Sequence, residues 1–224
     1  MTEGVHHETQ VEVQAAGVAL EGDLLVPDAS AGIVVFAHGS GSSRFSSRNR
    51  QVARYLADQG LASLLFDLLT PEESLIDERT RALRFDIPLI GTRMSEAVDW
   101  VAEAPETREL AIGLFGASTG AAAALIAAAE RPARVQAVVS RGGRPDLAGE
   151  ALSRVKAPTL LLVGGRDTQV IRLNEQAMSG MTAAPCELSL VPGASHLFEE
   201  PGTLDIVEAK AARWFLSHLG SGSG

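Results

Sequence analysis

The sequence predicts an α/β fold in which one doubly wound, mostly parallel sheet carries helices on both faces. Two observations predict it: short apolar runs rich in β-branched residues recur along the chain, and segments with helical spacing separate them. Continuous apolar runs of this length are typical of strands that are buried on both faces of a parallel sheet. The number of runs predicts about eight strands, joined by the βαβ connections of a doubly wound sheet.

The first two strands are expected to form an antiparallel pair between Thr9 and Pro27. Two stretches there alternate apolar and polar residues and meet near Gly17, as the strands of a hairpin do. The apolar runs predict six further strands, at Ile33–Ala37, Leu61–Phe66, Leu110–Phe115, Val135–Val139, Thr159–Val163 and Leu188–Val191.

Helices are expected between these strands because apolar residues recur there with helical spacing. Gly60 suits the end of a helix that contains Val52 and Leu56, since glycine is the usual residue just beyond a helix. An alanine-rich segment, 121–129, predicts another helix. Two amphipathic stripes predict two more, formed by Ile90, Met94, Val98 and Val101, and by Leu204, Val207, Ala211 and Trp214.

Length and composition fit one globular domain. The chain has 224 residues, of which 46% are hydrophobic and 21% charged, so it has enough apolar side chains for a core. No stretch inside it resembles a linker, and residues 1–219 are therefore expected to form a single domain. Residues 220–224 read GSGSG, the composition of a flexible linker or tail.

The charge balance excludes several classes of partner. Nineteen Lys and Arg against 28 Asp and Glu give a formal charge of −9, the wrong sign for binding nucleic acid or an anionic membrane surface. The single cysteine, Cys186, cannot form an intrachain disulfide, and the first ten residues lack the pattern of a signal peptide. We therefore expect a cytoplasmic protein that acts on a small molecule; its oligomeric state stays open.

The strongest chemical signal is the pentapeptide Gly116-Ala117-Ser118-Thr119-Gly120. It lies directly after a predicted strand and directly before the alanine-rich helix. A serine on such a sharp turn needs residues with almost no side chain two positions before and after it, which the two glycines provide. The turn places the hydroxyl at the carboxyl edge of the sheet, beside a helix N-terminus. Ser118 is therefore the candidate nucleophile.

A serine nucleophile needs a base, and His196 is the histidine best placed to be one. It follows the strand Leu188–Val191 across a short loop, at the edge of the sheet where Ser118 also emerges. The other histidines have other expected places: His6 and His7 in a polar tail, His38 in a glycine-rich turn and His218 in the last turn of a helix.

The base in turn needs a carboxylate to orient it, and Asp167 is the first choice. It follows the strand Thr159–Val163, and the chain order Ser118, Asp167, His196 is that of one hydrolase architecture. Asp146, after the preceding strand, is the alternative acid, because some hydrolases place the acid one strand earlier.

Two backbone N–H groups are expected to form an oxyanion hole. One belongs to Thr119, directly after the nucleophile, and the other to Ser40 in the glycine-rich turn 38–43. A phosphate-binding role for that turn is disfavoured, since the chain has neither the lysine of a P-loop nor a GxGxxG motif. The sequence has no cluster with metal-ligand spacing, so no metal or other cofactor is expected.

These motifs resemble those of a small bacterial subgroup of dienelactone-hydrolase-type α/β-hydrolases. The matching segments are HGSGSSR (38–44), LLFDLLTPEE (64–73), GLFGASTGAAAAL (113–125), SRGGRPDL (140–147), LLVGGRD (161–167) and VPGASHLFEEPG (191–202). The resemblance covers about residue 9 to 219. It implies an α/β-hydrolase fold, a Ser118, Asp167, His196 triad and hydrolysis of ester or related acyl bonds without a cofactor. Members of this subgroup are sometimes fused to a phosphoribosyltransferase-like domain.

One departure from the family concerns specificity. Dienelactone hydrolases carry cysteine at the nucleophile position, where this sequence has Ser118. This departure favours a general carboxylesterase over an enzyme specific for lactones. The expected activity is that of a serine hydrolase that cleaves carboxylic esters, of carboxylesterase or lactonase-like type. The alternatives are a thioesterase or acyltransferase that uses the same triad, and a non-catalytic protein that binds ligands on the same fold.

The connections suggest an open site. Only residues 140–158 lie between the sixth and seventh strands, too few for a large cap domain. Residues 70–88 are expected to form either a partial flap or a solvated helix. The candidate substrate-binding residues are the apolar Phe45, Leu69, Leu197 and Phe198, with Arg44, and less directly Arg141 and Arg166, as candidates to hold a substrate carboxylate.

Overall fold

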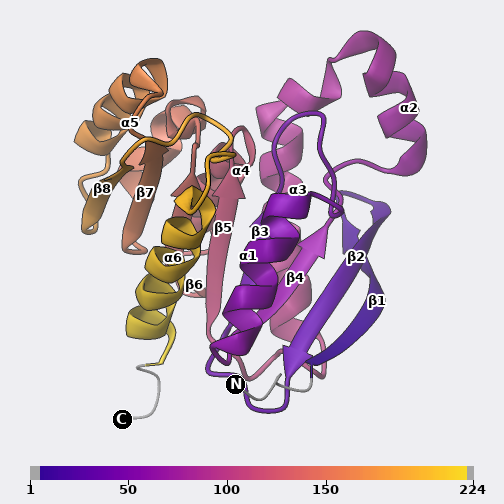
Figure 1. Cartoon of the computed structure of the whole chain (residues 1–224). Helices are drawn as coiled ribbons and strands as arrows, with labels where there is room; N and C mark the ends of the chain where they lie inside the picture. Colours follow the sequence, from indigo (N-terminus) through magenta and orange to yellow (C-terminus); the bar gives the residue numbers. More distant parts are fainter. Residues whose placement is uncertain (1–5, 221–224) are drawn as a thin grey trace.

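Eight strands hydrogen-bond into one sheet in a computed structural model that describes residues 6–220. The strand order is β1-β2-β4-β3-β5-β6-β7-β8, with β1 and β2 antiparallel to their neighbours and the remaining strands parallel (Figure 1). The strands are β1 (His6–Ala15), β2 (Val18–Pro27), β3 (Ile33–Ala37), β4 (Ala62–Phe66), β5 (Ile112–Ala117), β6 (Val135–Arg141), β7 (Thr159–Gly164) and β8 (Cys186–Val191).

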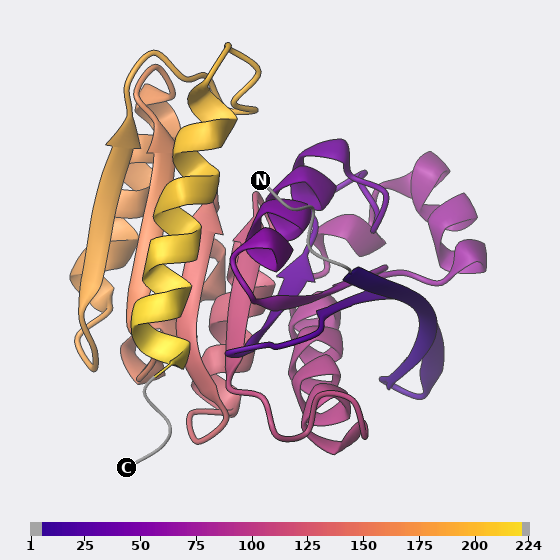
Figure 2. The same cartoon turned by 60° about the horizontal axis from the view of Figure 1, so that its bottom comes forward.

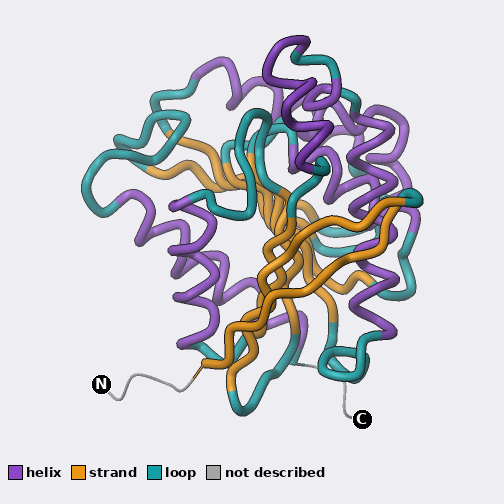
Figure 3. Tube along the Cα trace, turned by 90° about the vertical axis from the view of Figure 1, so that its right-hand side faces the viewer, coloured by secondary structure: helices purple, strands orange, loops and turns teal. Residues whose placement is uncertain are grey.

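Helices cover both faces of this sheet, and Figure 3 shows the twisted strands between them. The first and last helices pack on one face, where Figure 2 shows the last one lying along the strands, and the third, fourth and fifth pack on the opposite face. The helices are α1 (Ser47–Asp58), α2 (Pro71–Thr80), α3 (Ile87–Glu103), α4 (Gly120–Glu130), α5 (Thr168–Gly180) and α6 (Thr203–Leu219), with 3-10 segments η1 (Leu83–Phe85) and η2 (Pro145–Arg154).

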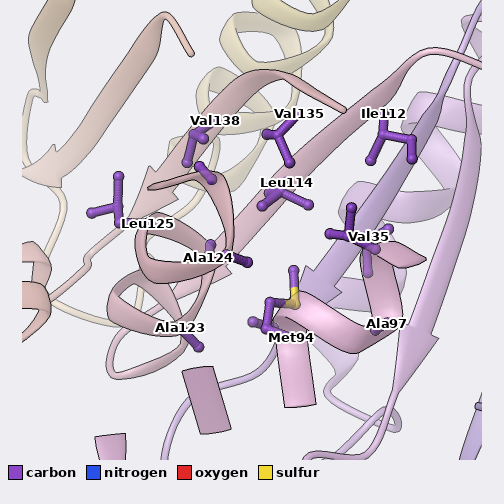
Figure 4. Close-up of a cluster of buried hydrophobic side chains, with 14 of the residues drawn as sticks. Val35, Met94, Ala97, Ile112, Leu114, Ala123, Ala124, Leu125, Val135 and Val138 are labelled. Carbon is purple, nitrogen blue, oxygen red and sulfur yellow. The ribbon is translucent and has the colours of Figure 1, made fainter. Parts of the chain in front are cut away.

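The core has two halves because alternate residues of each parallel strand face opposite sides. Val35 of β3 belongs to the cluster that packs on α3 and α4, whereas its neighbour Phe36 belongs to the cluster that packs on α1 and α6. Figure 4 shows part of the first cluster, to which Met94 of α3 and Leu114 of β5 both belong. Strands buried on both faces explain the continuous apolar runs of the sequence.

The structure confirms the predicted fold class and corrects some element boundaries. β1 begins at His6, so the two histidines assigned to a polar tail lie in a strand paired with β2. The link between β6 and β7 holds only η2, so no cap domain is inserted there, as the sequence predicts. Of the GSGSG tail, residues 221–224 lie outside the described part of the chain.

The segment 70–88 forms α2 and η1, which stand at the carboxyl edge of the parallel strands (Figure 1). Leu75, Ile76 and Phe85 are exposed there. Glu73 anchors α2 to α3 by accepting two 2.7 Å hydrogen bonds from the buried guanidinium of Arg93. Across residues 6–220, no helix has the length and apolar character that crossing a membrane requires.

Candidate active site

Ser118 occupies a strained turn between β5 and α4. Its φ is +52°, a left-handed conformation that side-chain-bearing residues seldom adopt. A Cβ atom on Gly116 would lie 2.6 Å from Gly120 O, and one on Gly120 would lie 2.6 Å from His38 O. The turn therefore requires glycine at both positions, and it leaves the serine hydroxyl at the carboxyl edge of the sheet.

His196 and Asp167 form a hydrogen-bonded pair at the same edge. His196 Nδ1 lies 2.7 Å from Asp167 Oδ2, and the aspartate is the less exposed partner. Asp167 is also the N-cap of α5, where its Oδ1 accepts from the N–H of Val170 at 3.3 Å. A carboxylate fixed by a helix N-terminus can hold the imidazole in one orientation, with Nδ1 protonated and Nε2 free to accept a proton.

Main-chain contacts position the two loops that carry this pair. The N–H of Arg166 donates to Ala194 O at 3.0 Å, and a Cβ on Gly164 would meet Ala194 O at 2.6 Å. Within the second loop, the N–H of Ser195 donates to Glu200 Oε2 at 3.0 Å. The close approach of the backbones explains the glycine that ends β7.

Ser118 and His196 flank the end of β6. The N–H of Ser118 donates to Arg141 O at 3.3 Å, and a Cβ on the next residue, Gly142, would lie 3.7 Å from His196 Cε1. The serine hydroxyl makes no hydrogen bond to the imidazole within residues 6–220. Catalytic hydrogen bonds are often long without substrate and tighten when it binds.

The alternative acid and the nearby histidine His38 have other partners. The carboxylate of Asp146 accepts from Nε and Nη2 of Arg144, at 2.9 and 2.7 Å. His38 is buried, and its Nε2 accepts from the N–H of Leu68 at 3.0 Å while its Nδ1 lies 2.9 Å from Gly39 O. This pattern requires a proton on Nδ1, and burial lowers the pKa of the ring. His38 is therefore a neutral brace between β3 and the residues after β4.

Thr119 belongs to the nucleophile turn itself, and Ser40 lies in the loop after β3. A Cβ on Gly39 would come within 3.0 Å of Ser118 Cβ, so the loop after β3 runs directly against the nucleophile. Neither the N–H of Ser40 nor that of Thr119 donates to a protein acceptor within the described chain. Two free donors near a serine hydroxyl suit a developing oxyanion.

A pocket of about 500 Å³ opens beside these donors. The loop 38–46 forms one wall and α2 with η1 the other, while Ser118 and His196 are not part of its lining. Its lining includes Ser40 and Thr119, so the pocket adjoins the elbow on the side of the proposed oxyanion hole. Sequence reasoning left the role of α2 open, and the structure assigns it a pocket wall through Ser74 and Glu78.

The candidate substrate-binding residues separate into two groups. Phe45, which is 56% exposed, and Leu69 line the pocket. Leu197 is 42% exposed outside that lining, whereas Phe198 is 3% exposed and packs in the core on the side of α1 and α6. A positive φ of +56° at Phe198 accompanies this inward position of its ring.

Arg44 lines the pocket, but its charge is already balanced. Its guanidinium contacts Asp67 of the loop after β4 and Glu21 of β2 at 2.7 Å, and it lies 3.6 Å from Asp23. It also covers the ring of Phe45, 4.2 Å from the ring centroid. The side chain therefore braces the pocket wall with little charge left for a substrate carboxylate.

Three comparisons place this architecture among known proteins. A model of the Dienelactone hydrolase family matches residues 20–218. The crystal structure of a dienelactone hydrolase from Anabaena variabilis ATCC 29413 is similar, with 56% identity, a TM-score of 0.93 and coverage of 95% of this chain and 98% of that chain. A dienelactone hydrolase-like promiscuous phosphotriesterase from metagenomic libraries is 19% identical with a TM-score of 0.75, covering 96% and 99%, and shares the fold.

Curated relatives from Mycobacterium tuberculosis are longer than this chain. "Putative phosphoribosyl transferase Rv0571c" of strain ATCC 25618 / H37Rv is 56% identical over 212 residues, which make up 95% of this chain. Those residues make up 47% of the relative, so this chain spans about half of its length.

Proposed function

The chain belongs to the dienelactone hydrolase family, and on that premise we propose that it is a serine hydrolase that cleaves carboxylic esters. The observation that carries the proposal is the pair formed by His196 Nδ1 and Asp167 Oδ2, 2.7 Å apart, at the edge where Ser118 emerges on its strained turn. Hydrolase activity is what the family implies; the serine mechanism and the ester substrate are our proposal.

In the proposed mechanism, Ser118 Oγ attacks the ester carbonyl carbon while His196 Nε2 takes the hydroxyl proton. The carbonyl oxygen becomes an oxyanion that accepts from the N–H groups of Thr119 and Ser40. When the tetrahedral intermediate collapses, the bond to the alcohol oxygen breaks and His196 returns the proton to the alcohol. Water then attacks the acyl-enzyme by the same steps and releases the acid.

Asp167 acts on this sequence through His196. Its negative charge stabilises the imidazolium that forms in each half-reaction, and its hydrogen bond keeps Nε2 directed toward the nucleophile. The proposed reaction needs no cofactor. Within residues 6–220, no group of three or more His, Cys, Asp or Glu side chains could hold a metal ion.

The name of the mycobacterial relatives describes proteins about twice as long as this chain. The groups that meet at the site described above, a serine on a nucleophile turn and a histidine paired with an acid, suit acyl transfer. The proposal for this chain therefore concerns acyl chemistry. We further propose, from sequence composition alone, that residues 1–219 are one domain and that the protein is cytoplasmic.

A fluorophosphonate probe tests the proposal directly, because such probes react with activated serines. We expect intact-mass measurement to show one adduct on the wild type and none on Ser118→Ala, with both proteins folded by circular dichroism. A panel of esters, thioesters and lactones, with and without an alcohol acceptor, then separates esterase from thioesterase and acyltransferase activity. A folded wild type that takes no label would contradict the proposal and favour a ligand-binding role.

A further inference from the structure

Glu200 is an acidic side chain that contacts the loops of both the candidate base and the candidate acid. Its Oε2 accepts from the N–H of Ser195, the residue directly before His196, at 3.0 Å. Its Oε1 lies 3.9 Å from Nη1 of Arg166, the residue directly before Asp167. One carboxylate therefore connects the residues that precede the two members of the proposed catalytic pair.

The backbone of Glu200 is fixed to the start of α6. Its O accepts from the hydroxyl of Thr203 at 2.7 Å and from the N–H of the same residue at 3.1 Å. Thr203 is buried and begins α6, which lies along the sheet (Figure 2). The carboxylate of Glu200 thus extends from a fixed point of the main chain toward the loop that precedes it.

The loop that carries His196 has few other hydrogen bonds. Within the described chain, the N–H groups of His196 and Leu197 donate to no protein acceptor. The N–H of Phe198 donates to Ser195 O at 3.4 Å, a long contact, while its ring packs in the core. His196 therefore lies between two anchors, which are the hydrogen bond from Ser195 to Glu200 and the buried ring of Phe198.

The two neighbouring acids of this loop have different partners. The hydrogen bond from the N–H of Ser195 lowers the pKa of the Glu200 carboxyl below its usual value, so the group is ionised at neutral pH. An ionised acceptor makes a stronger hydrogen bond than a neutral one. The side chain of Glu199 is 64% exposed and lies 3.5 Å from Arg48 of α1. Glu199 thus faces α1, whereas Glu200 faces the loops of the catalytic pair.

We propose that Glu200 is a positioning residue, which orients His196 for proton transfer through the main chain of Ser195. The inference rests on the proposed function, because it assigns Glu200 a role in the serine-hydrolase reaction. The imidazole must direct Nδ1 to Asp167 and Nε2 to Ser118 at once. A misplacement of about 1 Å can cost roughly 100-fold in rate, so the loop that carries the imidazole has to be held in place.

Three substitutions of Glu200 separate its hydrogen bond from its charge. Glu200→Gln keeps an acceptor at the same reach and loses the charge, whereas Glu200→Asp keeps the charge on a side chain that is one methylene shorter. Glu200→Ala loses both. With p-nitrophenyl acetate, we expect kcat to fall roughly 10- to 100-fold in Glu200→Ala and Glu200→Asp, and less than about 5-fold in Glu200→Gln.

Glu199→Ala is the matched control, because it removes the adjacent acid, whose partner Arg48 belongs to α1. It should keep kcat within a few-fold of the wild type. Wild-type activity in both Glu200→Ala and Glu200→Asp would overturn the inference. If Glu200→Ala failed to fold, the same kcat in Glu200→Asp as in Glu200→Gln would overturn it.

Proton NMR distinguishes positioning of the base from a general loss of stability. The proton that His196 Nδ1 donates to Asp167 should give a resonance far downfield, which is absent in His196→Ala. Well below the Tm of each protein, we expect this resonance in the wild type, Glu200→Gln and Glu199→Ala, and its loss by broadening in Glu200→Ala.

An unchanged resonance in a folded Glu200→Ala would overturn the positioning role. A wild type that shows the resonance but hydrolyses no ester and takes no fluorophosphonate label would instead contradict the proposed hydrolase function. The two failures are therefore distinguishable.

Discussion

Asp167 serves two elements at once: Oδ2 receives the hydrogen bond of His196 Nδ1 at 2.7 Å, and Oδ1 caps the first turn of α5. The cap fixes the carboxylate to the end of β7 independently of the imidazole. The orientation of His196 is thus tied to the sheet through a helix N-terminus, although His196 itself lies in a loop.

Replacing Asp167 with Asn should separate the two roles. Asparagine is as good an N-cap as aspartate, so the Tm should change little. The neutral amide neither stabilises an imidazolium nor enforces the tautomer with Nδ1 protonated, and kcat should fall by roughly 10³- to 10⁴-fold. Steady-state kinetics on p-nitrophenyl acetate measure the loss.

Asp146→Asn is the control, because this carboxylate pairs with Arg144 rather than with His196. It should retain kcat within a few-fold. A large loss in Asp146→Asn together with a small one in Asp167→Asn would reverse the assignment of the acid.

The strained backbone at Ser118 should lower the stability of the protein, although activity requires the serine. A φ of +52° costs a side-chain-bearing residue about 1 kcal/mol relative to glycine. Ser118→Gly and Ser118→Ala both remove the hydroxyl, and both should lose esterase activity. The glycine variant alone relieves the strain, so its Tm should exceed that of the alanine variant by roughly 2–4 °C. Equal Tm values in calorimetry would show that the turn stores no strain at this position.

The elements that sequence predicts well are those determined by local pattern. Gly116 and Gly120 mark the elbow because no other residue fits between the neighbouring backbones, and strands buried on both faces appear as continuous apolar runs. The candidate acid and base follow two parallel strands, β7 and β8, whose carboxyl ends necessarily share one edge of the sheet with β5.

The sequence does not predict contacts between segments that are distant along the chain. It suggests Arg44 as a residue that could hold a substrate carboxylate, but the acidic partners of Arg44 come from β2 and from Asp67, which only the folded sheet brings together. A positive φ accompanies the burial of Phe198 in the core, and this conformation has no signal in the sequence. Arg141 is buried and donates to Asn49, whereas Arg144 pairs with an acid, and nothing in the sequence SRGGRPDL distinguishes the two.

The buried histidine His38 should make stability depend on pH. Burial lowers its pKa below the usual 6.5 in the folded state, whereas in the unfolded chain the ring titrates normally. Above pH 6.5 both states are neutral and the stability is fully present. As the pH falls below 6.5 the unfolded state binds the proton first, so the free energy of unfolding decreases.

The variant His38→Gln removes this titration while keeping an acceptor for the N–H of Leu68. Between pH 7.5 and 5.5, urea unfolding should show the wild type losing roughly 1 kcal/mol more than the variant does. His7→Gln is the control, because the His7 side chain is 75% exposed, and it should follow the wild-type pH dependence. If the wild type and His38→Gln lost the same free energy over this range, His38 would not be the group that remains neutral in the folded state.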